Sequence, residues 1–90
     1  MTPLEQHEVL SAITVALVDV LPAGWQRTVV DYEADGRVGS GVRMADGSHV
    51  HVPVPKALAP HFRRLRTGDD WHRLSLVIDP PSKFHVTFHR

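Results

Sequence analysis

Two histidines, His49 and His51, stand two residues apart among valines in the stretch GSHVHVPVP, residues 47–55. Side chains two apart on a β-strand point to the same side, so the two imidazoles could share a metal ion or titrate together. Asp31 or His85 could supply further ligands if their strands lie nearby. Arginines expected on the same surface would repel a cation. We therefore expect no metal and no cofactor, and a histidine-based metal-binding domain stays as an alternative.

Spacing patterns that mark catalytic sites do not occur in the sequence. There is no G-x-S-x-G nucleophile elbow, no glycine-rich phosphate loop and no HExxH helix. Ser40 lies between Gly39 and Gly41, but a GSG triplet within a strand is more typical of a packing or bulge feature. The sequence therefore predicts a protein that is not an enzyme.

Charge gives a second constraint on function. Ten Lys and Arg residues balance ten Asp and Glu residues in a chain of 90, which also holds seven histidines. A net charge of zero argues against nucleic acid or a membrane surface as the partner. The local basic run of His61, Arg63, Arg64 and Arg66 keeps a small nucleic-acid-binding module as an alternative.

The cellular compartment is indicated by the absence of cysteine and by the composition of the N-terminal residues. The chain has no cysteine, which excludes disulfides and thiolate zinc sites. The first 20 residues carry too many acidic side chains for a signal peptide or a membrane-spanning helix. We therefore expect a single domain, residues 1–90, in the cytoplasm.

A helix is predicted in the N-terminal segment of the sequence. Thr2–Glu5 (TPLE) matches a capping box with proline at the first helical position. Apolar residues then recur at helical spacing from Leu4 to Leu21, and Pro22–Gly24 (PAG) would end the helix. One amphipathic helix that packs on a core is predicted here.

After Trp25 the apolar period changes to two, which is typical of strands with one buried face. Even-numbered residues from Thr28 onward would face the core, including Val50, Val52 and Val54 of the third strand. Two-residue turns would invert this parity. We therefore expect three-residue loops at 34–36 and 45–47, each ending in a glycine that can adopt positive φ.

A second, short helix is expected between the third and fourth strands. Pro60 would open its regular part, with Leu58, Phe62 and Leu65 inward and Gly68 as terminator. The predicted fold is α+β with the order α-β-β-β-α-β-β. It has two layers, an antiparallel sheet of about five strands with two helices on one face.

The odd-numbered side chains would then form a polar sheet face exposed to water. Asp31, Glu33 and Asp35 would make an acidic strip, and Gly39 and Gly41 would leave the backbone bare for a partner. The candidate partner-binding residues are Arg27, Asp31, Glu33, Asp35, Arg37, Arg43, His49, His51, Arg73 and His85. The alternative is an ordinary solvated face whose charges pair across strands.

Three stretches of this sequence together resemble a known family. LPAGW (Leu21–Trp25) follows the first helix, VPVP (Val52–Pro55) ends the third strand, and GDDWHRLSLVIDPPSKFHVTF spans Gly68–Phe88. The arrangement is similar to the YezG-like immunity proteins, whose pattern is helix, P-x-x-W, strands, an I/V-P exit, helix, then G-x-x-W-x-x-L-x-L-x-I-D…G-K-F…F. The matching positions are Trp25, Pro53, Trp71, Leu74, Leu76, Ile78, Asp79, Lys83, Phe84 and Phe88.

This resemblance implies an antitoxin. Members of the family bind a cognate bacterial toxin, often a nuclease or deaminase domain of a polymorphic toxin, and block it in the producing cell. The resemblance implies a non-catalytic inhibitor whose carboxylates Asp31, Glu33 and Asp35 would mimic nucleic-acid phosphates. The partner would be the toxin rather than nucleic acid or membrane, and a sheet edge could pair two copies.

Overall fold

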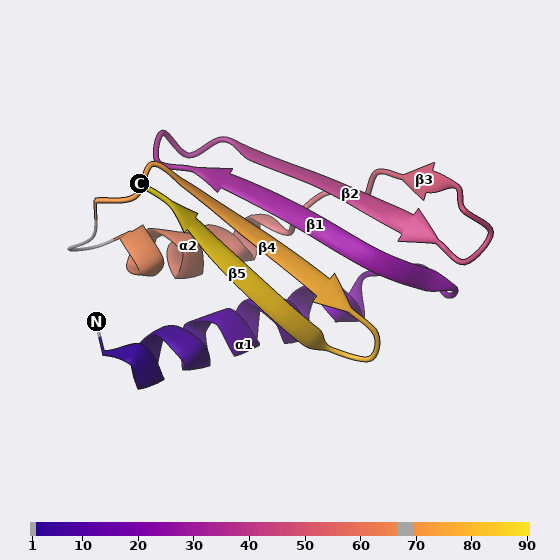
Figure 1. Cartoon of the computed structure of the whole chain (residues 1–90), viewed down its shortest axis with the longest axis horizontal. Helices are drawn as coiled ribbons and strands as arrows, with labels where there is room; N and C mark the ends of the chain where they lie inside the picture. Colours follow the sequence, from indigo (N-terminus) through magenta and orange to yellow (C-terminus); the bar gives the residue numbers. More distant parts are fainter. Residues whose placement is uncertain (1, 67–69) are drawn as a thin grey trace.

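The computed structural model describes residues 2–66 and 70–90, which form one sheet with both helices on one side (Figure 1). In chain order the elements are α1 (Pro3–Asp19), β1 (Trp25–Glu33), β2 (Val38–Met44), β3 (His49–Val50), the 3-10 turn η1 (Lys56–Leu58), α2 (Ala59–Arg66), β4 (Arg73–Asp79) and β5 (Lys83–His89). This is the predicted α+β fold with the order α-β-β-β-α-β-β.

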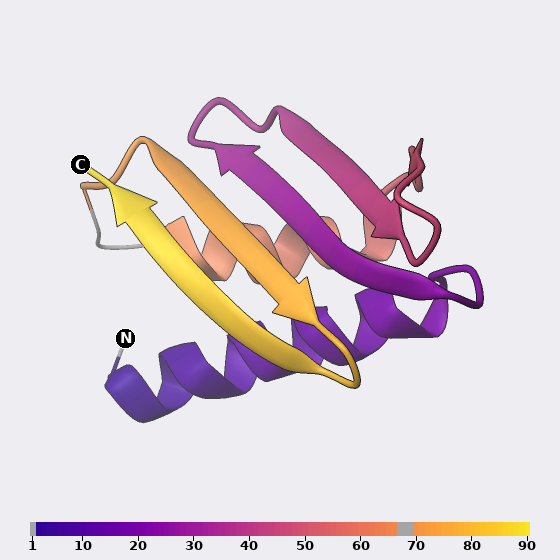
Figure 2. The ribbon, with the colours of Figure 1, turned by 45° about the vertical axis from the view of Figure 1, so that its right-hand side comes forward.

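The sheet has five antiparallel strands in the order β3-β2-β1-β4-β5. β1 lies at its centre because the chain returns through α2 and places β4 on the free side of β1 (Figure 2). The two edges differ in length, since β3 has two residues and β5 has seven. The helices cover one face, called here the covered face, and leave the other, the open face, to solvent.

α1 begins at the predicted cap but is shorter than predicted. The backbone N–H of Glu5 donates to Oγ1 of Thr2 at 3.2 Å, and Pro3 is the first helical residue. The Glu5 carboxylate accepts from the Thr2 hydroxyl at 3.0 Å rather than from its backbone N–H. The helix ends at Asp19 instead of Leu21. Leu4 was expected on the buried stripe, but it is 68% exposed.

Both three-residue loops are as predicted. In the first, the N–H of Glu33 donates to the carbonyl of Arg37 at 2.9 Å and Gly36 has φ +96°. In the second, the N–H of Met44 donates to the carbonyl of Ser48 at 2.8 Å and Gly47 has φ +87°. Because glycine carries no Cβ, it adopts this left-handed conformation without strain. The loops therefore keep even-numbered residues on the covered face.

The third strand is much shorter than predicted. Only His49 and Val50 pair with β2, and Val52 and Val54 lie outside the ladder. Proline has no N–H to donate and fixes its own φ, and it pushes the preceding residue towards extended conformations, so Pro53 and Pro55 prevent pairing from continuing. The chain instead leaves the sheet, and Oγ of Ser40 donates to the carbonyl of Val52 at 2.7 Å.

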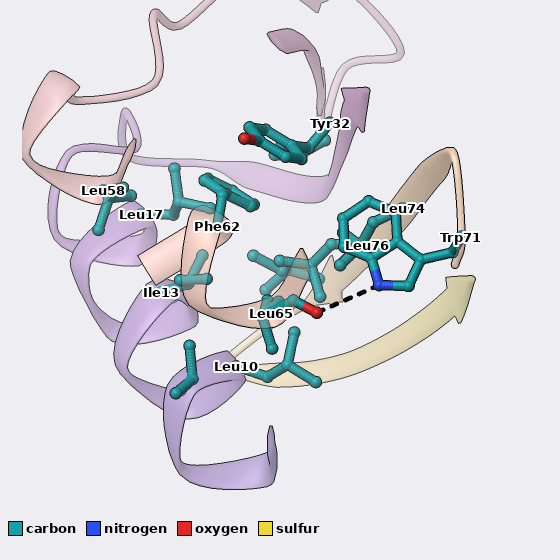
Figure 3. Close-up of a cluster of buried hydrophobic side chains, with 13 residues drawn as sticks. Leu10, Ile13, Leu17, Tyr32, Leu58, Phe62, Leu65, Trp71, Leu74 and Leu76 are labelled. Atoms are coloured by element: carbon teal, nitrogen blue, oxygen red, sulfur yellow. Dashed lines mark hydrogen bonds between the residues drawn. The ribbon is translucent and has the colours of Figure 1, made fainter. Parts of the chain in front are cut away.

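The core lies between the helices and β1, β4 and β5 (Figure 3). Leu58, Phe62 and Leu65 point into it as predicted, and the predicted terminator Gly68 lies outside the described residues. Trp71 is fully buried and its Nε1–H donates to the carbonyl of Leu65 at 3.2 Å. Tyr32 stacks on Phe62 with ring centroids 4.8 Å apart. These aromatic contacts join α2 to the central strand and to the start of β4.

The helices do not cover the whole face. Val38 on β2 and Val50 on β3 point to the covered face by parity, yet they remain 42% and 39% exposed. The expectation that all even-numbered strand residues lie beneath the helices is therefore wrong for Val38 and Val50, whereas Val42 of β2 is fully buried as expected. The core cluster is formed by the helices with β1, β4 and β5, and Val38 and Val50 lie outside it.

Candidate functional site

The candidate residues lie together on the open face or at its ends. Strand parity places Arg27, Asp31, Glu33, Arg43, His49, Arg73 and His85 there, on β1 to β5. Asp35 and Arg37 lie in the β1–β2 loop, and His51 follows β3. All ten are exposed or half-buried, whereas the even-numbered residues from Thr28 to Tyr32 on β1 and from Leu74 to Ile78 on β4 are buried. The ten candidate residues therefore share one surface.

The register arranges these side chains in rows across the strands. One end row contains His49, Arg43, Arg27, Asp79 and Lys83. The middle rows contain Gly41, Val29, Val77 and His85, followed by Gly39, Asp31, Ser75 and Thr87. The opposite end row contains Arg37, Glu33, Arg73 and His89. Charged rows thus flank a centre made of glycine, valine and small polar residues together with Asp31 and His85.

The acidic end is internally paired. Nη2 of Arg37 lies 2.6 Å from Oε2 of Glu33, and its Nε lies 2.8 Å from Oδ2 of Asp35. Hydrogen bonding from the backbone N–H of Arg37, with help from its guanidinium, lowers the pKa of Asp35. Oγ of Ser75 donates to Asp31 at 2.6 Å. The three carboxylates therefore do not form the bare anionic strip that phosphate mimicry would need.

The other end row is predominantly basic. Nε and Nη2 of Arg27 donate to the two carboxylate oxygens of Asp79 at 2.9 and 3.2 Å. The hydrogen bond from Arg27 lowers the pKa of Asp79, and the charges of Arg27, His85 and Arg43 act in the same direction. Among the residues that the structure describes, Arg43 forms no ion pair. The row therefore carries three basic side chains against one carboxylate, before any histidine is protonated.

The two ends are separated by an open glycine floor. A Cβ built on Gly39 or Gly41 would meet no atom within 4 Å, so neither residue is glycine for reasons of internal packing. A hollow of about 300 Å³ beside Gly41 is lined by Arg27, Val29, Gly41, Arg43 and His49. A second, of about 280 Å³, lies beside Gly39 and is lined by Asp31, Glu33, Arg37, Val38 and Gly39. The bare backbone is accessible to another molecule.

The histidines do not gather with further metal-ligating side chains in the described part of the chain. Nδ1 of His51 lies 3.3 Å from the carbonyl oxygen of Ser40, so this ring leans along the β2 edge. Within residues 2–66 and 70–90, no three His, Cys, Asp or Glu side chains gather closely enough to hold a metal ion. Because β3 ends at Val50, His51 does not pair with Gly41 of β2.

Several residues on the open face were not among the predicted site residues. Asp79 pairs with Arg27, and Ser75 joins Asp31 to Nε2 of His89, which lies 3.1 Å from its hydroxyl. The signal was present in the alternation of the fourth and fifth strands, where the odd-numbered positions hold these residues. What the sequence could not show was that β4 would lie directly beside β1.

The basic run of α2 lies on the other side of the molecule. Arg63 and Arg64 are exposed on a helix of the covered face, while Arg27 and Arg43 stand on the open face. Figure 1 shows α2 beneath the strands. The two groups of basic side chains therefore do not join into one continuous surface for a nucleic-acid backbone.

Comparison with known proteins does not test the resemblance drawn from the sequence. No family model matches the chain, and a search of the curated proteins gives no match. The likeness to the YezG-like immunity proteins rests on the motif that ends in Gly68–Phe88. In the described part of the chain, neither helix has the length and apolar character needed to cross a membrane.

Proposed function

We propose that this protein is a non-catalytic antitoxin of the immunity-protein type. It binds a cognate bacterial toxin through its open face and covers the toxin's active site. The resemblance to the YezG-like proteins points to a nuclease or deaminase domain as the toxin. On this proposal the protein acts in the cytoplasm of the cell that makes the toxin, and inhibition comes from steric and electrostatic occlusion rather than from chemistry on the toxin.

The observation that carries the proposal is the bare glycine floor between two charged rows. Gly39 and Gly41 sit in strand interiors, where glycine costs roughly 0.5–1 kcal/mol of stability relative to alanine. Neither position needs glycine for backbone conformation or for packing within the chain. Close approach of a second molecule to the backbone would explain glycine at these two positions, whereas folding of the chain alone does not.

The shape of the surface favours a macromolecular partner. The two hollows on the open face, of about 280 and 300 Å³, are at the small end for a pocket that would enclose a small molecule. A broad face with polar rows and an apolar centre at Val29 and Val77 has the anatomy of a protein interface instead. The opposite character of its two ends would fix the orientation of a partner that carries a complementary pattern.

Co-expression with the toxin tests the proposal. The toxin candidate is the secreted or multidomain protein encoded next to this chain, expressed in a host that it kills. We expect the wild-type chain to restore growth and to co-purify with the toxin domain. Arg43→Glu should reduce both, because it reverses the charge of an open-face basic side chain that forms no ion pair with any described residue.

Arg64→Glu supplies the matched control, since it makes the same change on an exposed position of α2. Protection that survives Arg43→Glu but is lost with Arg64→Glu would place the interface on the helices and reject the open face. Failure to protect against any neighbouring toxin, together with salt-sensitive binding to DNA or RNA, would favour the nucleic-acid alternative.

A further inference from the structure

The two edges of the sheet are protected to different degrees. One edge is formed by β3, which has two residues and is followed closely by prolines. β5 ends the other edge with seven residues that pair with β4 without a register shift. A long, regular edge without proline or bulge is an exposed template for another strand, and natural proteins usually blunt or cover such an edge. In β5 the only lysine, Lys83, stands at the very start.

The hydrogen-bonding direction of β5 follows from the ladder. In an antiparallel pair, the N–H and C=O of one residue point to the same neighbouring strand. The N–H of Ala34 donates to the carbonyl of His72, so Glu33 and Arg73 form a non-hydrogen-bonded pair. Arg73 must then point its backbone groups towards β5, where it pairs with His89. Odd-numbered residues of β5 therefore bond to β4, and the even-numbered ones point outward.

The outward-pointing residues of β5 are apolar. Phe84, Val86 and Phe88 present their backbone N–H and C=O groups to the edge and their side chains to the covered face, where each is only half-buried. Beside Phe84, a hollow of about 180 Å³ is lined by Ser11, Thr14, Val15, Ser82 and Phe84. Val15 is 65% exposed, and the buried hydroxyl of Thr14 has no hydrogen-bond partner among the described residues.

We propose that two copies of this chain associate through β5, in antiparallel register about a two-fold axis at Val86. The pairing is self-complementary, because it sets Val86 opposite its own copy and Phe84 opposite Phe88 of the second copy. Aromatic cross-strand pairs of this kind stabilise antiparallel sheets. Phe88 of the second copy would come beside the hollow at Phe84 and Val15. The result is a continuous ten-stranded sheet with helices on one side.

The size of this interface predicts a weak dimer. A seven-residue strand spans about 23 Å, and the edge of a two-layer protein is roughly 20 Å deep. The contact therefore covers on the order of 500 Å² on each copy, near the lower limit for specific association. The open face stays free in this dimer, so the inference does not depend on the proposed function.

Sedimentation velocity of the full chain across a hundredfold concentration range tests the dimer. We expect the apparent mass to rise from one chain to two. Val86→Pro should keep the chain monomeric, because proline there removes an outward N–H and no bond to β4. Val15→Glu should do the same from α1 without touching the strand. Val38→Glu, an exposed valine near the opposite edge, is the matched control and should leave the dimer intact.

A cross-link tests the register. The chain has no cysteine, so Val86→Cys introduces a single thiol. Directly opposed residues in a hydrogen-bonded pair have Cα atoms about 5.5 Å apart, within disulfide range. Mild oxidation should join two Val86→Cys chains and should not join two Phe84→Cys chains. A chain that stays monomeric at all concentrations would overturn the proposal, and so would a dimer lost only with Val38→Glu.

Discussion

Arg27 on β1 and Asp79 at the end of β4 form a two-point ion pair, although 52 residues separate them in the chain. Both nitrogen–oxygen distances, 2.9 and 3.2 Å, fit a fork of two parallel hydrogen bonds. The pair ties the central strand to its non-sequential neighbour at the basic end of the open face. Both side chains are partly exposed, so solvent screens their attraction.

The Arg27–Asp79 pair predicts a specific dependence of stability on pH. The hydrogen bond from Arg27 lowers the pKa of Asp79 in the folded chain. A carboxyl group whose pKa is lowered by folding stabilises the folded state at pH values above its unfolded pKa of about 3.9. This stabilisation is lost as the pH falls through the pKa of the folded state. Asp79→Asn should therefore flatten the decline of Tm between pH 5 and pH 2. Glu8→Gln, on the exposed side of α1, is the control and should keep the wild-type slope.

Trp71 should be the most costly residue to truncate. Its indole is fully buried against Tyr32 and Phe88, and its N–H bonds to the carbonyl of Leu65. Trp71→Ala should lower the free energy of unfolding by about 3–5 kcal/mol, a large part of the roughly 5–15 kcal/mol of a small domain. Urea denaturation measures this. Trp71→Phe should lower the free energy of unfolding by less. A loss below about 1 kcal/mol for Trp71→Ala would contradict this packing.

Gly41→Val separates folding from binding. The added side chain has free space in the isolated protein and favours a strand, so the free energy of unfolding should rise by roughly 0.5–1 kcal/mol. The same side chain would fill the floor of the open face and should weaken retention of the toxin. Gly47→Val is the control at φ +87° and should destabilise the chain. If Gly41→Val binds the toxin normally, the glycine floor is not part of the interface.

The acidic end gives a further prediction for the toxin complex. Asp31→Ala combined with Glu33→Ala removes two half-exposed carboxylates, one with a part-buried bond from Ser75 and the other with an exposed bond from Arg37. We expect Tm to change by no more than a few degrees, because exposed pairs contribute about 0–1 kcal/mol each. Neutralisation of the toxin should fall. Unchanged neutralisation would confine the interface to the basic end and the glycine floor.

Much of the fold could be predicted because one constraint governed it. Strand parity required Gly36 and Gly47 to close three-residue loops, and the same parity sorted the open face from the core. The pattern failed where local chemistry acted against it. Pro53 and Pro55 ended β3 early, and Val38 shows that an apolar position at the right parity is buried only if a helix lies beneath it.

Parity predicted that the ten candidate residues share one surface, but it predicted neither their pairings nor the additional residues Asp79, Ser75 and His89. Parity placed Arg27, Arg37 and Asp31 on one surface, but their partners depended on strand order. Asp79 reaches Arg27 only because β4 lies beside β1. Arg37 bends back to Glu33 and Asp35 in the loop, which removes the free anionic strip that the sequence suggested. Side-chain bonds of this kind carry no periodic signal in the sequence.

The short pairing of β3 with β2 has a consequence for local unfolding of the sheet. Val38 and Val50 are each about two-fifths exposed, and β3 pairs with β2 through two residues alone. Segments with so few buried contacts open locally at a free energy far below that of global unfolding. Backbone amides of Val42 and Val50 should therefore exchange with deuterium sooner than those of Val30 and Leu76, so this hairpin forms the loosest cooperative unit of the sheet.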